Sequence, residues 1–176
     1  MCLIKDKWPR RYADHISPGY EKAVKGVNTI KKIIIFNKQF TRKEDKKDYW
    51  QYPWQTWERK TYDCEDMAIL HMDILDRNVK TEELYFIIVG GDYMKDGKRT
   101  RGAHAITVAK ANIEAGHPAW HVFSNKLIFT YDQEEASDHD FIEWGKRWYP
   151  LGIKYFEKRD RTGKVLRRRW KWIGYL

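Results

Sequence analysis

The chain has 176 residues, of which 42% are hydrophobic and 15% are aromatic. This composition can fill one core, so it excludes global disorder and predicts a single domain spanning residues 1–176. Lysine and arginine outnumber aspartate and glutamate by 34 to 25, and the net charge of +9 keeps nucleic acids and acidic proteins among the candidate partners.

The first residues carry charges where a secretory signal would have its apolar stretch. No part of the sequence approaches the roughly 20 consecutive apolar residues of a membrane span. We therefore expect a cytoplasmic protein that makes no membrane contact. In that compartment Cys2 and Cys64 are not expected to form a disulfide.

Helical patterns come first along the chain. Ser17 is a good N-cap and Pro18 suits the first helical position, and apolar residues then recur at helical spacing, which predicts a helix over residues 17–35. Residues 41–47 are expected to form a charged connector. The aromatic segment 49–57 follows, and its proline is expected to disfavour regular structure.

A second helix is expected to begin near Asp63. Asp63 as the N-cap and Asp66 three positions later form an approximate capping box, and Asn78 is a suitable end. The buried face of this helix is expected to comprise Met67, Ala68, Leu70, His71, Ile74 and Leu75. Cys64 then lies in the first turn of the helix.

Strand patterns occupy most of the remaining chain, with turn signals such as Asp96–Gly97 between them. Strands are predicted over residues 83–89, 103–109, 119–123 and 126–131, a helix over 141–149, and a hairpin from 153–156 and 165–172. This order predicts an α+β fold in which a helix packs on an antiparallel sheet.

Cys64 is the first candidate for chemistry. A helix N-terminus places free backbone N–H groups and partial positive charge beside a thiol, which favours the thiolate. Asp63, Glu65 and Asp66 act in the opposite direction, so a reactive Cys64 needs a nearby cation. An imidazolium is a common partner of a cysteine nucleophile.

His104 is the histidine best placed to supply that cation, because it stands at the start of an apolar strand. A third group should orient its imidazole through the other ring nitrogen. Asn125 and Asp132, which follow the next two strands, are both candidates for this role. The pairing of consecutive antiparallel strands favours Asn125.

Three ordered motifs between residues 45 and 125 resemble those of the bacterial transglutaminase-like cysteine proteinases. The motifs are Trp50-x-x-Pro53-x-x-Thr56, Asp63-Cys64-Glu65-Asp66 followed by Ala68-Ile69, and His104-Ala105 at a strand start. The resemblance implies a papain/transglutaminase-like core, in which the helix that carries the nucleophile packs on an antiparallel sheet. It also implies that Cys64 is the nucleophile and His104 the general base and acid. No cofactor is expected.

The chain departs from the family pattern at the third catalytic position. Where the family has an aspartate followed by an asparagine, this chain has Phe123-Ser124-Asn125, which leaves a serine at the aspartate position. Asn125 could take the role after a shift of one residue, and Asp132 could replace it from further along. Some family members bind calcium near the nucleophile, which makes Asp66 a calcium candidate, although a helix cap is favoured.

An oxyanion hole needs hydrogen-bond donors beside the nucleophile. The backbone N–H of Cys64 is one donor, and a side chain from the upstream aromatic segment is expected to be the second. The candidates, which would also line a substrate groove, are Trp50, Gln51, Gln55 and Trp57. Packing in the core is the alternative role of the tryptophans.

Two other patterns concern binding rather than catalysis. His117 and His121 are four residues apart, but Pro118 and the strand pattern after it argue against a helical metal site. The segment from Arg167 to Trp172 interleaves cations with aromatic residues, as nucleic-acid-binding proteins do. A basic module that binds nucleic acid or an acidic protein without catalysis is therefore the alternative function.

The sequence thus predicts a cysteine-dependent acyl-transfer enzyme, a peptidase or amide hydrolase that acts on a protein or peptide through a thioester. Hydrolysis is favoured over transfer of the acyl group to an amine because the resemblance is to the proteinase branch. The small size and basic character would suit a protein encoded by a phage or mobile element.

Overall fold

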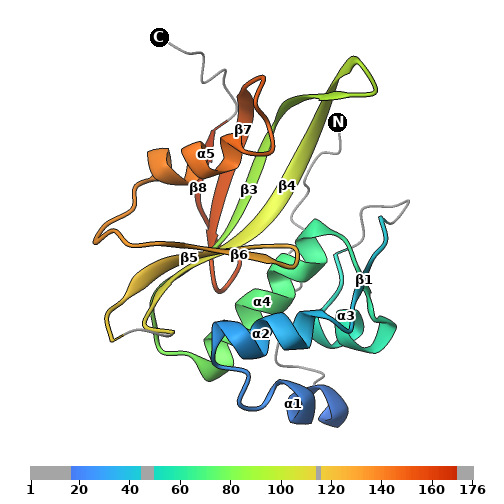
Figure 1. Ribbon diagram of the computed structural model, residues 1–176, viewed down its shortest axis with the longest axis vertical. Coiled ribbons are helices and arrows are strands. Elements are labelled where there is room, and N and C mark those ends of the chain that lie inside the picture. Colours follow the sequence, from blue (N-terminus) through green and yellow to red (C-terminus); the bar gives the residue numbers. More distant parts are fainter. Residues whose placement is uncertain (1–16, 45–49, 114–115, 170–176) are drawn as a thin grey trace.

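An antiparallel sheet organises the chain. The computed structural model describes residues 17–44, 50–113 and 116–169, and within them six strands pair in the order β6-β5-β4-β3-β7-β8 (Figure 1). The strands are β3 (Thr81–Lys95), β4 (Lys98–Ala111), β5 (Ala119–Ser124), β6 (Leu127–Tyr131), β7 (Ile153–Asp160) and β8 (Val165–Arg169). The long strands β3 and β4 form a central hairpin around the predicted turn, where Asp96 and Gly97 both have positive φ.

Helices cover both faces of this sheet (Figure 1). On one side lie α1 (Pro18–Val24), α2 (Ile30–Asn37), α3 (Pro53–Arg59) and α4 (Cys64–Asn78), and on the other lies α5 (Asp138–Lys146). Successive strand residues alternate between two cores: Phe86 and Ile88 pack on the α4 side, and Ile87 and Val89 pack on the α5 side. The chain therefore has the predicted α+β fold with an antiparallel sheet.

The helix α4 is the most deeply buried element of its layer. Its residues 65–75 are all buried, because α4 lies between the sheet and the other helices of that side. Thr107 Oγ1 on β4 donates to the Ala68 carbonyl oxygen at 2.5 Å, and Tyr20 on α1 donates to Asp73 at 2.5 Å. These contacts fix the position of the helix start against the sheet.

The helix predicted over residues 17–35 is in fact two helices, α1 and α2. Gly26 adopts a φ of 76°, which interrupts the first helix at little steric cost. Thr29 then caps the second helix by accepting a hydrogen bond from the Lys32 backbone N–H. The apolar spacing continues across the break, so periodicity alone did not reveal it.

Pro53 does not disrupt regular structure but begins α3. At the first helical position the missing N–H of proline costs no hydrogen bond, and its fixed φ suits the helix. The predicted connector over residues 41–47 contains β1 (Thr41–Arg42), which pairs in parallel with β2 (Thr61–Tyr62). None of the helices within the described ranges has the length and apolar character needed to cross a membrane.

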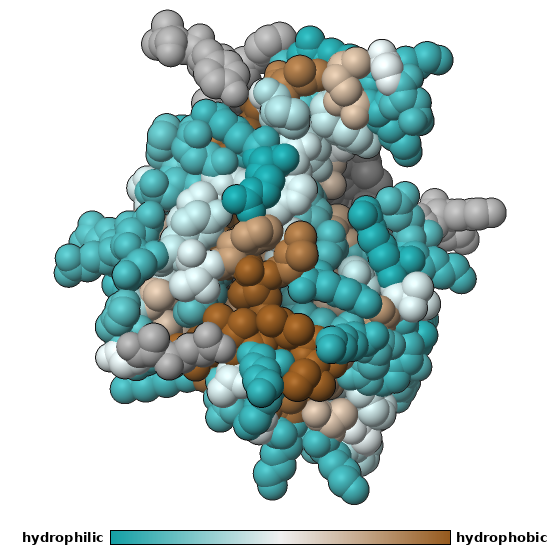
Figure 2. Space-filling view, in the orientation of Figure 1, coloured by the Kyte–Doolittle hydropathy of each residue, from teal (hydrophilic) through white to brown (hydrophobic). Residues whose placement is uncertain are grey.

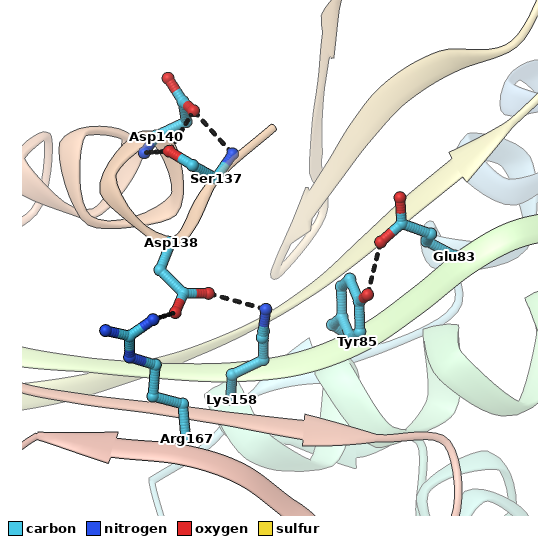
Figure 3. Close-up of polar contacts among 7 residues, drawn as sticks. All are labelled: Glu83, Tyr85, Ser137, Asp138, Asp140, Lys158 and Arg167. Carbon is cyan, nitrogen blue, oxygen red and sulfur yellow. Dashed lines mark hydrogen bonds and ion pairs between the residues drawn. The ribbon is translucent and has the colours of Figure 1, made fainter. Parts of the chain in front are cut away.

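The helix α5 is anchored over the last two strands (Figure 3). Ser137 caps its first turn, and the Asp138 carboxylate forms ion pairs with Lys158 on β7 and with Arg167 on β8, each with an N–O distance of 2.7 Å. The start of α5 is thereby held over the sheet. The strand predicted over 165–172 is described only as far as Arg169, and the rest of that prediction lies outside the described residues.

Candidate active site

The start of α4 places Cys64 as its first residue. Asp63 has extended backbone, and its carboxylate accepts from the Asp66 N–H, while the Asp66 carboxylate accepts from the Asp63 N–H. This is the predicted capping box, and it is confirmed. Cys64 therefore lies in the first turn of a helix, as the sequence predicted.

The Cys64 sulfur lies against β4 and beside an acidic side chain. The backbone N–H of Ala105 donates to the sulfur, and the thiol donates to Glu65 Oε2 at 3.2 Å. Burial raises the pKa of the Cys64 thiol, and the charges on Glu65 and Asp63 raise it further, which outweighs the lowering effect of the Ala105 N–H. The resting group is a neutral thiol.

His104 precedes Ala105 on β4, and its imidazole is also neutral. The side chain is 7% exposed and its ring packs on Trp148, with 4.8 Å between the ring centroids. Burial, and to a smaller extent the charge of Arg42, lower the pKa of His104 to about 4. The ion pair of thiolate and imidazolium expected from the sequence is therefore not the resting state, because burial disfavours both charges.

Ser124 is the residue that orients His104. Its hydroxyl lies 2.8 Å from His104 Nε2 and the residue is 1% exposed. Thr107 on β4 lies opposite Phe123 on β5, so the alternation of side chains puts His104 and Ser124 on the same face of the sheet. The serine thus occupies the position at which the resembled family has an aspartate.

Neither predicted third residue makes a hydrogen bond or ion pair with His104 within the described part of the chain. Asn125 begins the β5–β6 turn with a φ of 52°, and its buried Oδ1 lacks a hydrogen-bond partner among the described residues. Asp132 follows the far end of β6, roughly 15 Å along the hairpin from Ser124, and pairs with His117 at 2.9 Å. The turn starts directly after Ser124. The shift by one residue that would have placed Asn125 beside the His104 ring therefore does not occur.

Three of the four residues predicted to form the oxyanion hole or substrate groove have packing or capping contacts instead. Trp50 is buried and its ring packs on Phe86, with 5.5 Å between centroids. Trp57 packs on Tyr20, with 6.3 Å between centroids. Gln55 accepts a hydrogen bond from the Tyr52 N–H at 3.0 Å and so caps α3. The alternative role of the tryptophans, packing, is the one these contacts support.

Gln51, the fourth of these residues, binds Asp66. Its backbone N–H donates to Asp66 Oδ1 at 2.7 Å and its side-chain amide donates to Oδ2. Burial and the charge of Asp63 raise the pKa of Asp66 to about 7, although the hydrogen bonds from Gln51 and Asp63 oppose this. Both oxygens accept hydrogen bonds from N–H donors, which supports the helix-cap role that the sequence favoured for Asp66. Across the described ranges no group of three or more metal-binding side chains occurs.

Tyr149 is a site residue that the sequence pattern did not mark. It is 5% exposed, and burial raises its pKa, as does its proximity to Cys64. Its hydroxyl is therefore protonated at neutral pH and can donate a hydrogen bond. It packs so closely on Gly91 that an added Cβ there would lie 2.7 Å from the Tyr149 Cβ. No local signal could have linked it to Cys64, because the turn after α5 brings it there through the tertiary fold.

No protein-family model matches the chain, and a search of curated proteins finds no match either. Functional inference therefore depends on the chemical groups of the residues described above. These are a thiol at a helix start, a neutral imidazole held by a hydroxyl, and a protonated phenol.

Replacing Glu65 by glutamine is expected to make Cys64 more reactive. The change removes the nearby charge and the carboxylate that accepts the thiol proton, both of which raise the pKa of Cys64. Alkylation by iodoacetamide near neutral pH should become about tenfold faster, as measured by peptide mass spectrometry with Cys2 as internal reference. Glu82→Gln, a change at the surface, should leave the rate unaltered. Equal rates for Glu65→Gln and the unmodified protein would show that Glu65 does not control the thiol.

Proposed function

We propose that the chain is a cysteine-dependent acyl-transfer enzyme with a papain/transglutaminase-like core, acting as a peptidase or amide hydrolase. One observation carries the proposal. The Cys64 sulfur accepts a hydrogen bond from Ala105, and the preceding residue, His104, is held by Ser124 through Nε2. A nucleophile at a helix start, with an oriented imidazole on the adjoining strand, has the parts that nucleophilic catalysis requires.

The reaction starts from neutral groups. When the Ser124 hydroxyl accepts the Nε2–H, Nδ1 is the basic nitrogen of His104 and can take the Cys64 proton as the sulfur attacks a carbonyl carbon. The imidazolium then returns this proton to the departing amine, which leaves a thioester on Cys64. Water hydrolyses the thioester with His104 again acting as the base. Because the pKa of His104 is lowered, its imidazolium is a stronger acid than an ordinary imidazolium, which favours protonation of the amine.

The carbonyl oxygen becomes negatively charged in this step and needs donors. The backbone N–H of Cys64 at the start of α4 is one, as the sequence predicted. The Tyr149 hydroxyl, which burial keeps protonated, is the second donor that we propose. It takes the role expected of the upstream aromatic segment, where the Gln51 amide donates to Asp66 instead.

The experiment that tests this function combines a peptide library with substitutions around His104. The unmodified protein should generate new peptide termini, detected by mass spectrometry, and His104→Ala should reduce cleavage to background. Ser124→Asp places a carboxylate beside Nε2, so the pKa of His104 should rise and the acidic limb of the pH–rate profile should move to higher pH. A purely structural role of Ser124 would change the rate without moving that limb. No cleavage of any library member by the unmodified protein would contradict the proposal.

A basic binding module without catalysis is the second candidate. The neutral resting thiol and the serine in place of an aspartate favour it. Part of its expected contact surface is already engaged, because Arg167 pairs with Asp138 and Arg168 pairs with Glu157 at 2.5 Å. Salt-dependent binding of DNA or RNA, together with no peptide turnover, would favour the module.

A further inference from the structure

The two edges of the sheet differ in how they are protected. The edge strand β8 has the sequence VLRRR, and its three consecutive arginines disfavour pairing with another strand. The opposite edge strand, β6, has the sequence LIFTY, with no charge and no proline, and its pairing with β5 has no bulge. An edge strand without such features is a template for a further strand.

Among the described residues no strand pairs with the outer side of β6, so this side offers backbone groups for pairing. The Asn125–Lys126 turn joins it to β5, and Ser124 lies opposite Leu127. In such a hairpin Leu127 exchanges backbone hydrogen bonds with Ser124, and every second residue of the strand does the same with its own partner. The residues between them, Ile128 and Thr130, therefore direct their N–H and C=O groups away from β5. Two residues with outward groups are enough to set the register of a partner strand.

Apolar surface lies beside this strand. Figure 2 shows it across the part of the molecule where Figure 1 draws β6 and α2. Leu127 on β6 is 59% exposed, and Ile34 and Ile35 on α2 are 41% and 55% exposed. A strand added at β6 would cover part of this surface, and burial of apolar area would stabilise the pairing.

Charges at the two ends of β6 indicate the partner. Lys126 precedes the strand and Asp132 follows it, at equal distances in sequence from Phe129. When two copies of β6 pair antiparallel about Phe129, Lys126 of each copy lies opposite Asp132 of the partner subunit, and Ile128 lies opposite Thr130 of the partner subunit. The Asp132 side chain pairs with His117 through Oδ1 but is 81% exposed, so the carboxylate is accessible for such a pair as well. The residues with outward backbone groups thus face one another.

We propose that the protein forms a two-fold symmetric dimer through antiparallel pairing of β6, which joins two sheets into one. Three features of β6 support this pairing: the strand itself carries no charge, the backbone groups of Ile128 and Thr130 point outward, and opposite charges stand at its two ends. The dimer is an interaction beyond the proposed enzyme activity and does not depend on it. It also adjoins the turn that follows Ser124, the residue that holds His104.

Sedimentation velocity over a concentration series tests the dimer. The unmodified protein should dimerise, and Lys126→Glu or Asp132→Lys alone should raise the dimer Kd by about tenfold because like charges then face one another. The double variant should restore the original Kd, and a mixture of the two single variants should form heterodimers. Thr130→Pro removes an outward N–H from an edge strand, so it should give a monomer that circular dichroism shows to be folded.

Two results would overturn the proposal. One is a monomer throughout the concentration series, whether or not an extended peptide binds to it. The other is a dimer whose Kd does not respond to the exchanged charges or to Thr130→Pro, which would place the interface on another surface. Both results leave the peptidase proposal unaffected, since they concern only the β6 edge.

Discussion

Replacing Cys64 by alanine should abolish peptide turnover while the chain still folds. The sulfur is the only group in the proposed reaction that bonds to the substrate, so the rate should fall by at least about a thousandfold. The fold should persist because the cap of α4 is made by Asp63 and Asp66, and alanine is a strong helix former. The rate on a cleaved library peptide, with thermal unfolding followed by circular dichroism, measures both outcomes.

Two further variants serve as controls for this prediction. Cys2→Ala should leave turnover unchanged, because that cysteine has no part in the proposed chemistry. Cys64→Ser keeps the size and hydrogen-bonding capacity of the side chain, yet its hydroxyl is a far weaker nucleophile with a weakly basic imidazole, so it should also be inactive. Full turnover by Cys64→Ala would rule out the thioester mechanism.

Replacing Glu157 by alanine should lower the free energy of unfolding by about 3–5 kcal/mol. Glu157 on β7 is 0% exposed and its oxygens accept from Arg159 and Arg168, each at 2.5 Å, and from the Tyr155 hydroxyl. Arg159 is itself only 1% exposed, so the substitution removes the carboxylate that balances a buried cation. Urea unfolding of the two proteins measures the difference.

The matched controls separate the buried charge from the lost volume. Glu157→Gln keeps most of the volume but removes the charge, so it should also destabilise the protein strongly. A double variant, Glu157→Leu with Arg159→Met, replaces the pair by apolar groups and should recover much of the lost stability. Glu82→Ala, at a more exposed position, should cost less than about 0.5 kcal/mol. A similarly small cost for Glu157→Ala would show that the buried carboxylate does not stabilise the fold.

The helix that carries Cys64 was predictable because its signals are local. Asp63, Asp66 and the apolar run after them lie within a few turns of one another, and the structure places each as expected. The break at Gly26 was missed because a single glycine is tolerated in many helices. The role of Pro53 was misjudged because proline ends some helices and begins others, according to its position.

The sequence could suggest candidate residues for a site but not their protonation. Cys64 and His104 could be chosen from the sequence, whereas their neutral resting forms follow from burial, which the sequence does not give. The contact between His104 and Ser124 depends on where β5 ends and its turn begins. Tyr149 reaches the site only through the packing of α5 on the sheet, so no local pattern could identify it.

The most direct measurement is the mass of the protein during reaction with an activated peptide ester, quenched in acid and analysed by mass spectrometry. A chain that works as we propose gains one acyl group, mapped to Cys64, and the gain is absent from the Cys64→Ala and His104→Ala variants. No acyl group on Cys64, or one found equally on Cys2 or on lysine side chains, would contradict the proposed nucleophile.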